Sequence, residues 1–186
     1  MKRPRNRELE AQLGDDPAAY LVYADWLLSQ EDWYSQAHGE LIGAQVRGDE
    51  AAAAKILEEQ ADWLIGEMSD GFAATWHWGF IEEARLGIEE PCWIDQSTVL
   101  KALFKLGTAK RMDSLVLGDF GDEDDDYEDV DASASYEDAI ERIAKTKVPP
   151  PLKRLVIRPT RMPLLNVTVG DLGPALERFG QKLREP

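Results

Sequence analysis

The strongest concentration of reactive side chains is an acidic run at residues 119–131. Carboxylates at alternate positions are ligands of a calcium-binding loop, which also needs a glycine at its sixth position and a glutamate at its twelfth. Counted from Asp122, those positions hold Tyr127 and Ser133, so the pattern predicts no metal site. The run is expected to be either a solvated loop or a docking site for a basic protein. The carboxylates of that docking site would be Asp122, Glu123, Asp124, Asp125, Asp126, Glu128 and Asp129.

The histidines and the cysteine offer little further chemistry. His38 and His77 are the only histidines, and neither has a second His or Cys at the spacing of a zinc site. Cys92 has no neighbouring base in the sequence that would activate it as a nucleophile. A glycine-rich phosphate loop is also missing from the sequence. We therefore predict no catalytic residues, no metal and no cofactor.

Two carboxylates in the N-terminal third, Asp25 and Glu40, would suit acid and base roles if they were paired in space. We favour a structural interpretation, in which both side chains cap helices or pair with arginines. Asp25 precedes Trp26 and is expected to be a buried, hydrogen-bonded anchor between helices. Tyr23 and Trp78 complete the set of expected structural anchors.

Two aromatic residues, Trp33 and Tyr34, lie in a polar insert at residues 30–37. Exposed aromatic side chains on a loop are typical anchors of protein interfaces. The alternative is that both side chains fold back over the neighbouring helices. The tryptophans expected to join the core instead are Trp26, Trp63, Trp76 and Trp78.

Composition restricts the class of protein. The chain has 186 residues, of which 44% are apolar, and its 36 acidic and 21 basic residues give a net charge of −15. This charge repels the phosphate backbone, so nucleic acid is not an expected ligand. The single cysteine fits a reducing compartment. No apolar run approaches the roughly 18 residues of a membrane span and no secretory signal follows the basic N-terminus, so we expect a cytoplasmic protein without membrane contact.

Spaced apolar residues predict four helices before residue 66. Asp16 is expected to cap the second helix, because Pro17 suits the first helical position. Aromatic and branched residues between Thr75 and Leu86 then predict one strand or a hairpin. The four expected helices lie around Leu9 and Leu13, over Pro17–Ser29, over Ser35–Arg47 and over Glu50–Leu64.

Beyond residue 94, helix and strand patterns alternate and recur after a constant shift along the sequence. This shift carries Leu115, Val116 and Leu117 onto Leu155, Val156 and Ile157, and Leu103 onto Ile143. Both strand patterns have the apolar spacing of leucine-rich repeats. The expected fold is α/β, an N-terminal four-helix unit followed by a short leucine-rich-repeat-like α/β solenoid. Its parts are the helical domain (1–66), a tryptophan-rich strand connection (67–94) and the repeat-like region (95–186) with the acidic loop 119–131.

Three segments resemble the bacterial repeat-companion domain. They are Leu-Val-Tyr-Ala-Asp-Trp-Leu at 21–27, Gly-Glu-Leu-Ile at 39–42 and Trp-Gly-Phe-Ile at 78–81. The resemblance implies a small helical N-terminal domain joined to leucine-rich-type repeats, and so covers most of the chain. It also implies a role in interaction, with no established catalytic residues to carry over.

The function expected from these features is non-catalytic binding of a basic or mixed-charge protein. Trp33 and Tyr34 would act as anchors beside the steering charge of the acidic loop. One alternative is an acidic immunity or antitoxin-like inhibitor of a basic toxin or nuclease, and a remote one is a hydrolytic enzyme. A homodimer is also expected as an alternative, formed through the terminal strand edge at Leu152 to Arg158.

Overall fold

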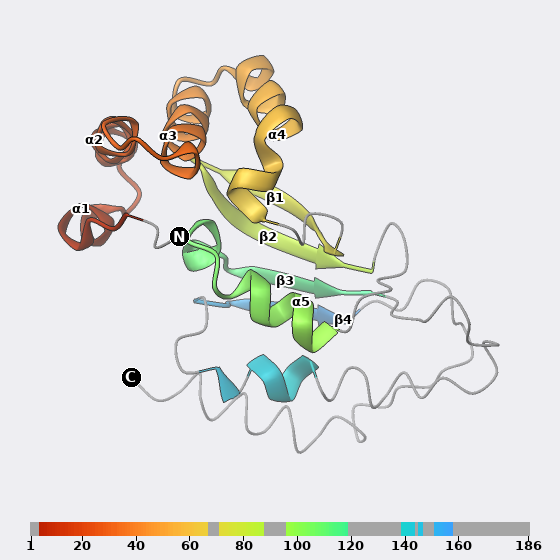
Figure 1. Ribbon diagram of the computed structural model, residues 1–186. Coiled ribbons are helices and arrows are strands. Elements are labelled where there is room, and N and C mark those ends of the chain that lie inside the picture. The colour runs from red at the N-terminus through yellow and green to blue at the C-terminus, as the bar shows by residue number, and fades with distance from the viewer. Residues whose placement is uncertain are drawn as a thin grey trace, which may run out of the picture.

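The computed structural model describes residues 4–66, 71–87, 96–118, 139–143, 145–146 and 151–157. These residues form a mixed α/β arrangement in which helices pack on a four-stranded sheet (Figure 1). Within these ranges no helix is long and apolar enough to cross a membrane. The elements in chain order are α1 (Arg7–Gln12), α2 (Pro17–Leu28), α3 (Trp33–Val46), α4 (Glu50–Ile65), β1 (Ala73–His77), β2 (Phe80–Leu86), α5 (Gln96–Leu103), the 3₁₀ helix η2 (Thr108–Arg111), β3 (Ser114–Leu117) and β4 (Arg154–Ile157).

Aspartates start three of the N-terminal helices. Asp16 accepts a hydrogen bond from the Ala18 amide at 3.0 Å, and Asp32 and Asp49 accept corresponding bonds at the starts of α3 and α4. Each side-chain oxygen satisfies an amide that the first helical turn leaves without a partner. The four predicted helices are confirmed, with small shifts of their ends. Because Asp32 is the cap, α3 begins earlier than predicted, and Trp33 and Tyr34 lie in a helical turn instead of a loop.

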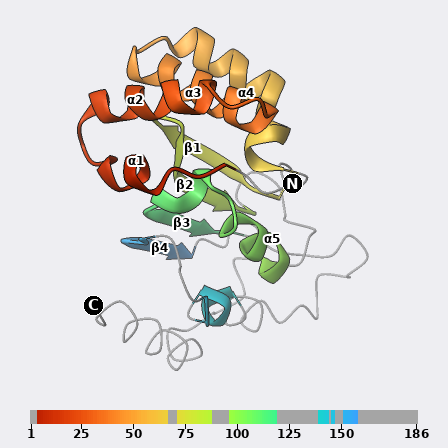
Figure 2. The ribbon, with the colours of Figure 1, turned by 60° about the vertical axis from the view of Figure 1, so that its left-hand side comes forward.

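The sheet has the strand order β1-β2-β3-β4. β1 and β2 form an antiparallel hairpin, which was one of the two predicted alternatives, and β3 and β4 continue the sheet in parallel. Figures 1 and 2 show α2, α3 and α4 grouped at the hairpin end of the sheet, with α5 beside β3. β4 is one of the two edge strands of the described sheet, and pairing of two copies at this edge stays a prediction.

The constant shift found in the sequence is the register of the parallel ladder between β3 and β4. The paired residues are Leu115 with Leu155, Val116 with Val156, and Leu117 with Ile157. The same shift relates Asp113 to Lys153, whose side chains form an ion pair at 3.1 Å. Leu103 and Ile143, the predicted helix anchors, are both buried. The mixed α/β class is therefore confirmed, whereas a leucine-rich-repeat solenoid stays a prediction.

One hydrophobic cluster connects the helices to the sheet. Leu41 of α3 and Leu64 of α4 are fully buried in the same cluster as Ile81 of β2 and Leu115 of β3. Leu103 of α5 belongs to this cluster as well. Burial of each such side chain contributes roughly 1.5–3 kcal/mol. The helices before residue 66 therefore share their core with the strands that follow them.

The turn between β1 and β2 is fixed against α3. Its two residues, Trp78 and Gly79, have φ angles of 47° and 79°, as the tight type I′ hairpin turn requires. The Gly79 amide donates to Gln45 Oε1 at 2.6 Å, and the Gly79 carbonyl accepts a hydrogen bond from His38 Nε2 at 2.9 Å. A Cβ atom at residue 79 would lie 2.2 Å from Ile42 Cγ1, so only glycine allows this approach.

Replacing Gly79 with alanine is expected to destabilise the fold by about 2–4 kcal/mol, because a left-handed backbone and crowding against α3 both add cost. Gly48 is a matched control, since it also has a positive φ of 71° but a Cβ atom there would meet nothing within 4 Å. Gly48→Ala should therefore cost only about 1–2 kcal/mol. Urea unfolding measures both values, and equal losses would contradict the close packing of the turn on Ile42.

Candidate functional site

Two tryptophans form an exposed stacked pair on α3 and α4. Trp33 is 72% exposed and Trp63 is 52% exposed, and only Val22 and Leu28 join them as exposed large apolar side chains in the part of the chain that the structure describes. Their ring centroids lie 6.3 Å apart with an interplanar angle of 25°. Trp33 starts α3 and Trp63 is near the end of α4. We call Trp33 and Trp63 the tryptophan pair.

Exposed carboxylates neighbour the tryptophan pair in the sequence. Glu31 lies just before the start of α3, and Glu59 lies one helical turn before Trp63 on α4. Both residues are exposed. Among the described residues, Glu59 forms an ion pair only with Lys55, in which Glu59 Oε1 lies 3.8 Å from Lys55 Nζ. Both side chains of this pair are largely in solvent. Such an exposed pair contributes little to stability. Flat aromatic rings beside carboxylates suit a guanidinium or ammonium group.

Tyr34 does not extend this surface. It is half-buried, its ring lies 5.5 Å from that of His38, and a Cβ atom at Gly107 would lie 2.5 Å from its hydroxyl. Adjacent helical residues point in different directions, so Tyr34 folds back over the helices while Trp33 stays exposed. A joint role of Trp33 and Tyr34 in binding a partner stays a prediction. The predicted acidic docking residues, Asp122, Glu123, Asp124, Asp125, Asp126, Glu128 and Asp129, lie outside the described residues.

The predicted structural anchors divide into aromatic residues that are at least partly buried and carboxylates that are exposed. Tyr23 is buried, and Trp26 stacks on it with ring centroids 5.6 Å apart. Trp78 is half-buried. Asp25 and Glu40 are exposed, so the buried anchor predicted at Asp25 is wrong. Helical periodicity explains this result, because the faces of α2 and α3 that pack inward are occupied mainly by apolar residues.

One further prediction about an aromatic residue needs correction, and one ring lies where strand geometry alone would not place it. Trp63 was expected in the core, but it lies on the outer side of α4 and is exposed. On a regular strand, alternation would point His77 away from Trp78. Its ring instead stacks on Trp78 with centroids 4.3 Å apart, because Trp78 belongs to the turn and leaves the strand period. In the part of the chain that the structure describes, no three His, Cys, Asp or Glu residues are placed to hold a metal.

A cavity of about 480 Å³ lies between the N-terminal segment, α3 and η2. Four cationic side chains and a single carboxylate line it, together with aromatic rings. We call it the basic cavity. Its charged residues are Arg5, Glu10, Lys105, Lys110 and Arg111. Sequence reasoning missed this site, because its cations come from two segments far apart in the sequence and form no motif.

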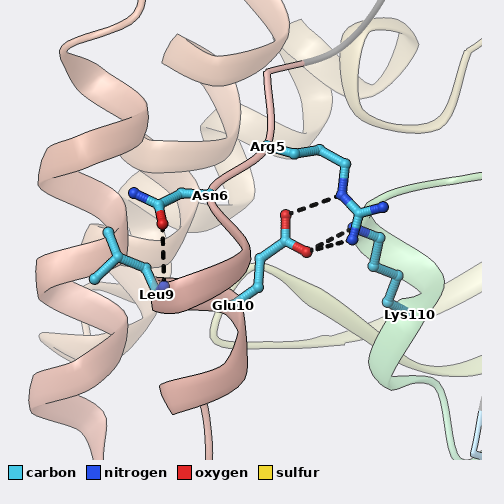
Figure 3. A network of polar contacts seen from close by, with 5 residues as sticks. All are labelled: Arg5, Asn6, Leu9, Glu10 and Lys110. Atoms are coloured by element: carbon cyan, nitrogen blue, oxygen red, sulfur yellow. Dashed lines mark hydrogen bonds and ion pairs between the residues drawn. The ribbon is translucent and has the colours of Figure 1, made fainter.

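Glu10 holds one wall of the basic cavity together (Figure 3). Its carboxylate accepts hydrogen bonds from Arg5 Nη2 at 2.7 Å and from Lys110 Nζ at 3.1 Å, and its side chain is only 15% exposed. Burial of the carboxylate opposes its ionisation. Hydrogen bonds from the two cations and their charges outweigh that effect and hold the pKa of Glu10 below its usual value. The contact ties α1, which has no buried residues, to η2.

No family model, curated protein or solved structure matches the chain. The resemblance to the repeat-companion domain therefore stays a prediction. The three segments that carry it do contact one another, however. Gly39 approaches Ala24 and Leu28, and Gly79 lies against Ile42.

Replacing Glu10 with glutamine is expected to lower the free energy of unfolding by about 0.5–1 kcal/mol at pH 7, the range of partly exposed ion pairs. The folded pKa of Glu10 is lowered, so its contribution is complete above the ordinary value of 4.5 and is lost as the pH falls through the folded pKa. Urea unfolding at a series of pH values measures this effect. The difference in the free energy of unfolding between wild type and variant should shrink as the pH falls through the folded pKa of Glu10.

Glu8 provides the matched control for this measurement. It lies in the same first turn of α1 and is exposed, and it forms no ion pair among the described residues. Glu8→Gln should change stability by less than about 0.5 kcal/mol at any pH. A loss for Glu10→Gln that stays constant between neutral and acidic pH would contradict the ionic origin of the contact.

Proposed function

We propose that the chain is a non-catalytic protein-binding module that uses the tryptophan pair to hold an arginine- or lysine-rich segment of a partner protein. The observation that carries this proposal is the large exposure of two stacked indole rings on neighbouring helices. Tryptophan side chains are costly to leave in water and are enriched among the residues that dominate binding energy. The stacked pair offers a flat apolar platform whose shape two packed helices maintain.

The choice of a basic partner rests on charge. The chain carries a net charge of −15, and exposed carboxylates at Glu31 and Glu59 neighbour the pair in the sequence. Negative potential speeds the approach of a cationic segment at low salt. A cation placed over an indole face then adds about 0.5–2 kcal/mol. The acidic run at 119–131 is proposed to contribute to steering.

The constant shift between the two strand patterns supports the further proposal that the C-terminal region is built from leucine-rich-type repeats, since that shift is a ladder register between β3 and β4.

We also propose that the protein is located in the cytoplasm, because a single cysteine suits a reducing compartment. Cell fractionation tests the location, and recovery of the protein outside the cytoplasmic fraction would refute it.

A labelled hexa-arginine peptide is the probe that tests the binding surface. We expect the double variant Trp33→Ala, Trp63→Ala to bind it about tenfold more weakly than wild type, a loss of about 1.4 kcal/mol. Fluorescence anisotropy at constant ionic strength measures the dissociation constants. The double variant has the same net charge as wild type. If overall charge alone attracted the peptide, the two proteins would therefore bind it with equal affinity.

Val22→Ala is the matched control, because Val22 is an exposed apolar residue at 54% on α2 and is not part of the tryptophan pair. Its affinity should stay within about twofold of wild type. Thermal unfolding of all variants verifies that the fold is retained. Equal affinities of wild type and the double tryptophan variant would exclude the tryptophan pair as the contact surface.

A further inference from the structure

The basic cavity has the size and lining of a small-molecule site. Its volume of about 480 Å³ lies within the range of roughly 300–1,000 Å³ that holds organic ligands. Leu13, Tyr23 and Phe80 line it and are buried, which gives it an apolar wall. Tyr34 lines it as well and brings a phenol group from the first turn of α3. Such a lining suits a ligand with an apolar or aromatic body.

The charges of the cavity are unbalanced toward positive. Arg5 and Lys110 share the single carboxylate of Glu10. Among the described residues, Lys105 and Arg111 have no carboxylate within ion-pair distance, although the chain as a whole is strongly acidic. Uncompensated cations beside an apolar wall attract an anion, and the partly desolvated surroundings strengthen that attraction.

Arg111 is held in place without being neutralised. Its guanidinium donates to the Leu13 carbonyl at 2.5 Å and to the Gly14 carbonyl at 3.5 Å. It also lies 5.7 Å from the centroid of the Tyr20 ring. Carbonyl oxygens and an aromatic face fix the position of the group but leave its full charge. A fixed guanidinium loses little side-chain freedom when it binds an oxyanion.

We infer that the basic cavity binds a small organic oxyanion, in which a phosphate or carboxylate group faces Lys105 and Arg111 and an apolar body packs on Leu13, Tyr23 and Phe80. This site is separate from the tryptophan pair and has the opposite charge preference. It needs neither the proposed protein partner nor the acidic run.

Isothermal titration calorimetry with phenyl phosphate and with benzoate tests this inference on the intact chain. At least one of the two probes should bind saturably below about 10 mM, whereas benzyl alcohol, which has the ring without the charge, should not. Tighter binding of phenyl phosphate assigns a phosphate ligand, and tighter binding of benzoate assigns a carboxylate ligand. In nuclear magnetic resonance titrations, the Gly107 and Arg111 amide signals should shift with the same affinity.

A pair of lysine variants distinguishes binding inside the basic cavity from attraction by the overall charge of the protein. Lys105→Gln removes a cation from the basic cavity, and Lys101→Gln removes one from the exposed side of α5. Lys105→Gln should weaken the bound probe about fivefold, and Lys101→Gln should leave its affinity within about twofold. Equal effects of the two variants, binding of benzyl alcohol as tight as that of the anions, or no saturable binding of either anion would overturn the inference.

Discussion

The arrangement of helices on the sheet depends on how the turn at Trp78 and Gly79 is held against α3. Both polar backbone groups of Gly79 are satisfied by α3 side chains, the amide by Gln45 and the carbonyl by His38. The left-handed turn and the absence of a Cβ atom let the backbone touch Ile42. A buried amide or carbonyl without a partner is costly, so the hairpin and the helix fix one another's position. The aromatic cluster around Tyr20, Tyr23 and Phe80 then fills the space beside this contact.

Fixing α3 also positions the two surfaces proposed for binding. Trp33 and Tyr34 are neighbours in its first turn, yet Trp33 stacks on Trp63 in solvent whereas Tyr34 lines the basic cavity. Two adjacent residues of one helical turn therefore belong to different surfaces, one with acidic neighbours and one whose charged residues are mainly cations. The Glu10 contact with Arg5 and Lys110 holds α1 as a wall of that cavity. In a chain with a net charge of −15, this separation would let each of the two proposed surfaces select its own class of ligand.

Much of the fold could be predicted from the sequence, because its signals are local or periodic. Asp16 followed by Pro17 marks the start of α2, and the constant shift from Leu115 to Leu155 predicts which residues of β3 and β4 face each other. The candidate sites were harder to predict. The exposure of Trp63 depends on which face of α4 meets the core. The basic cavity brings together Arg5 and Lys105, which lie far apart in the sequence. Neither feature belongs to a motif or to a repeated pattern, so composition and spacing do not predict it.

The most direct measurement is a nuclear magnetic resonance titration of the intact chain with hexa-arginine. It follows the indole N–H signals and so tests whether the tryptophan pair is a contact surface. The signals of Trp33 and Trp63 are expected to shift together and saturate at the same peptide concentration. Those of the partly buried Trp26 and Trp78 should stay in place. Saturating shifts of Trp26 or Trp78, with Trp33 and Trp63 unchanged, would contradict the proposed surface.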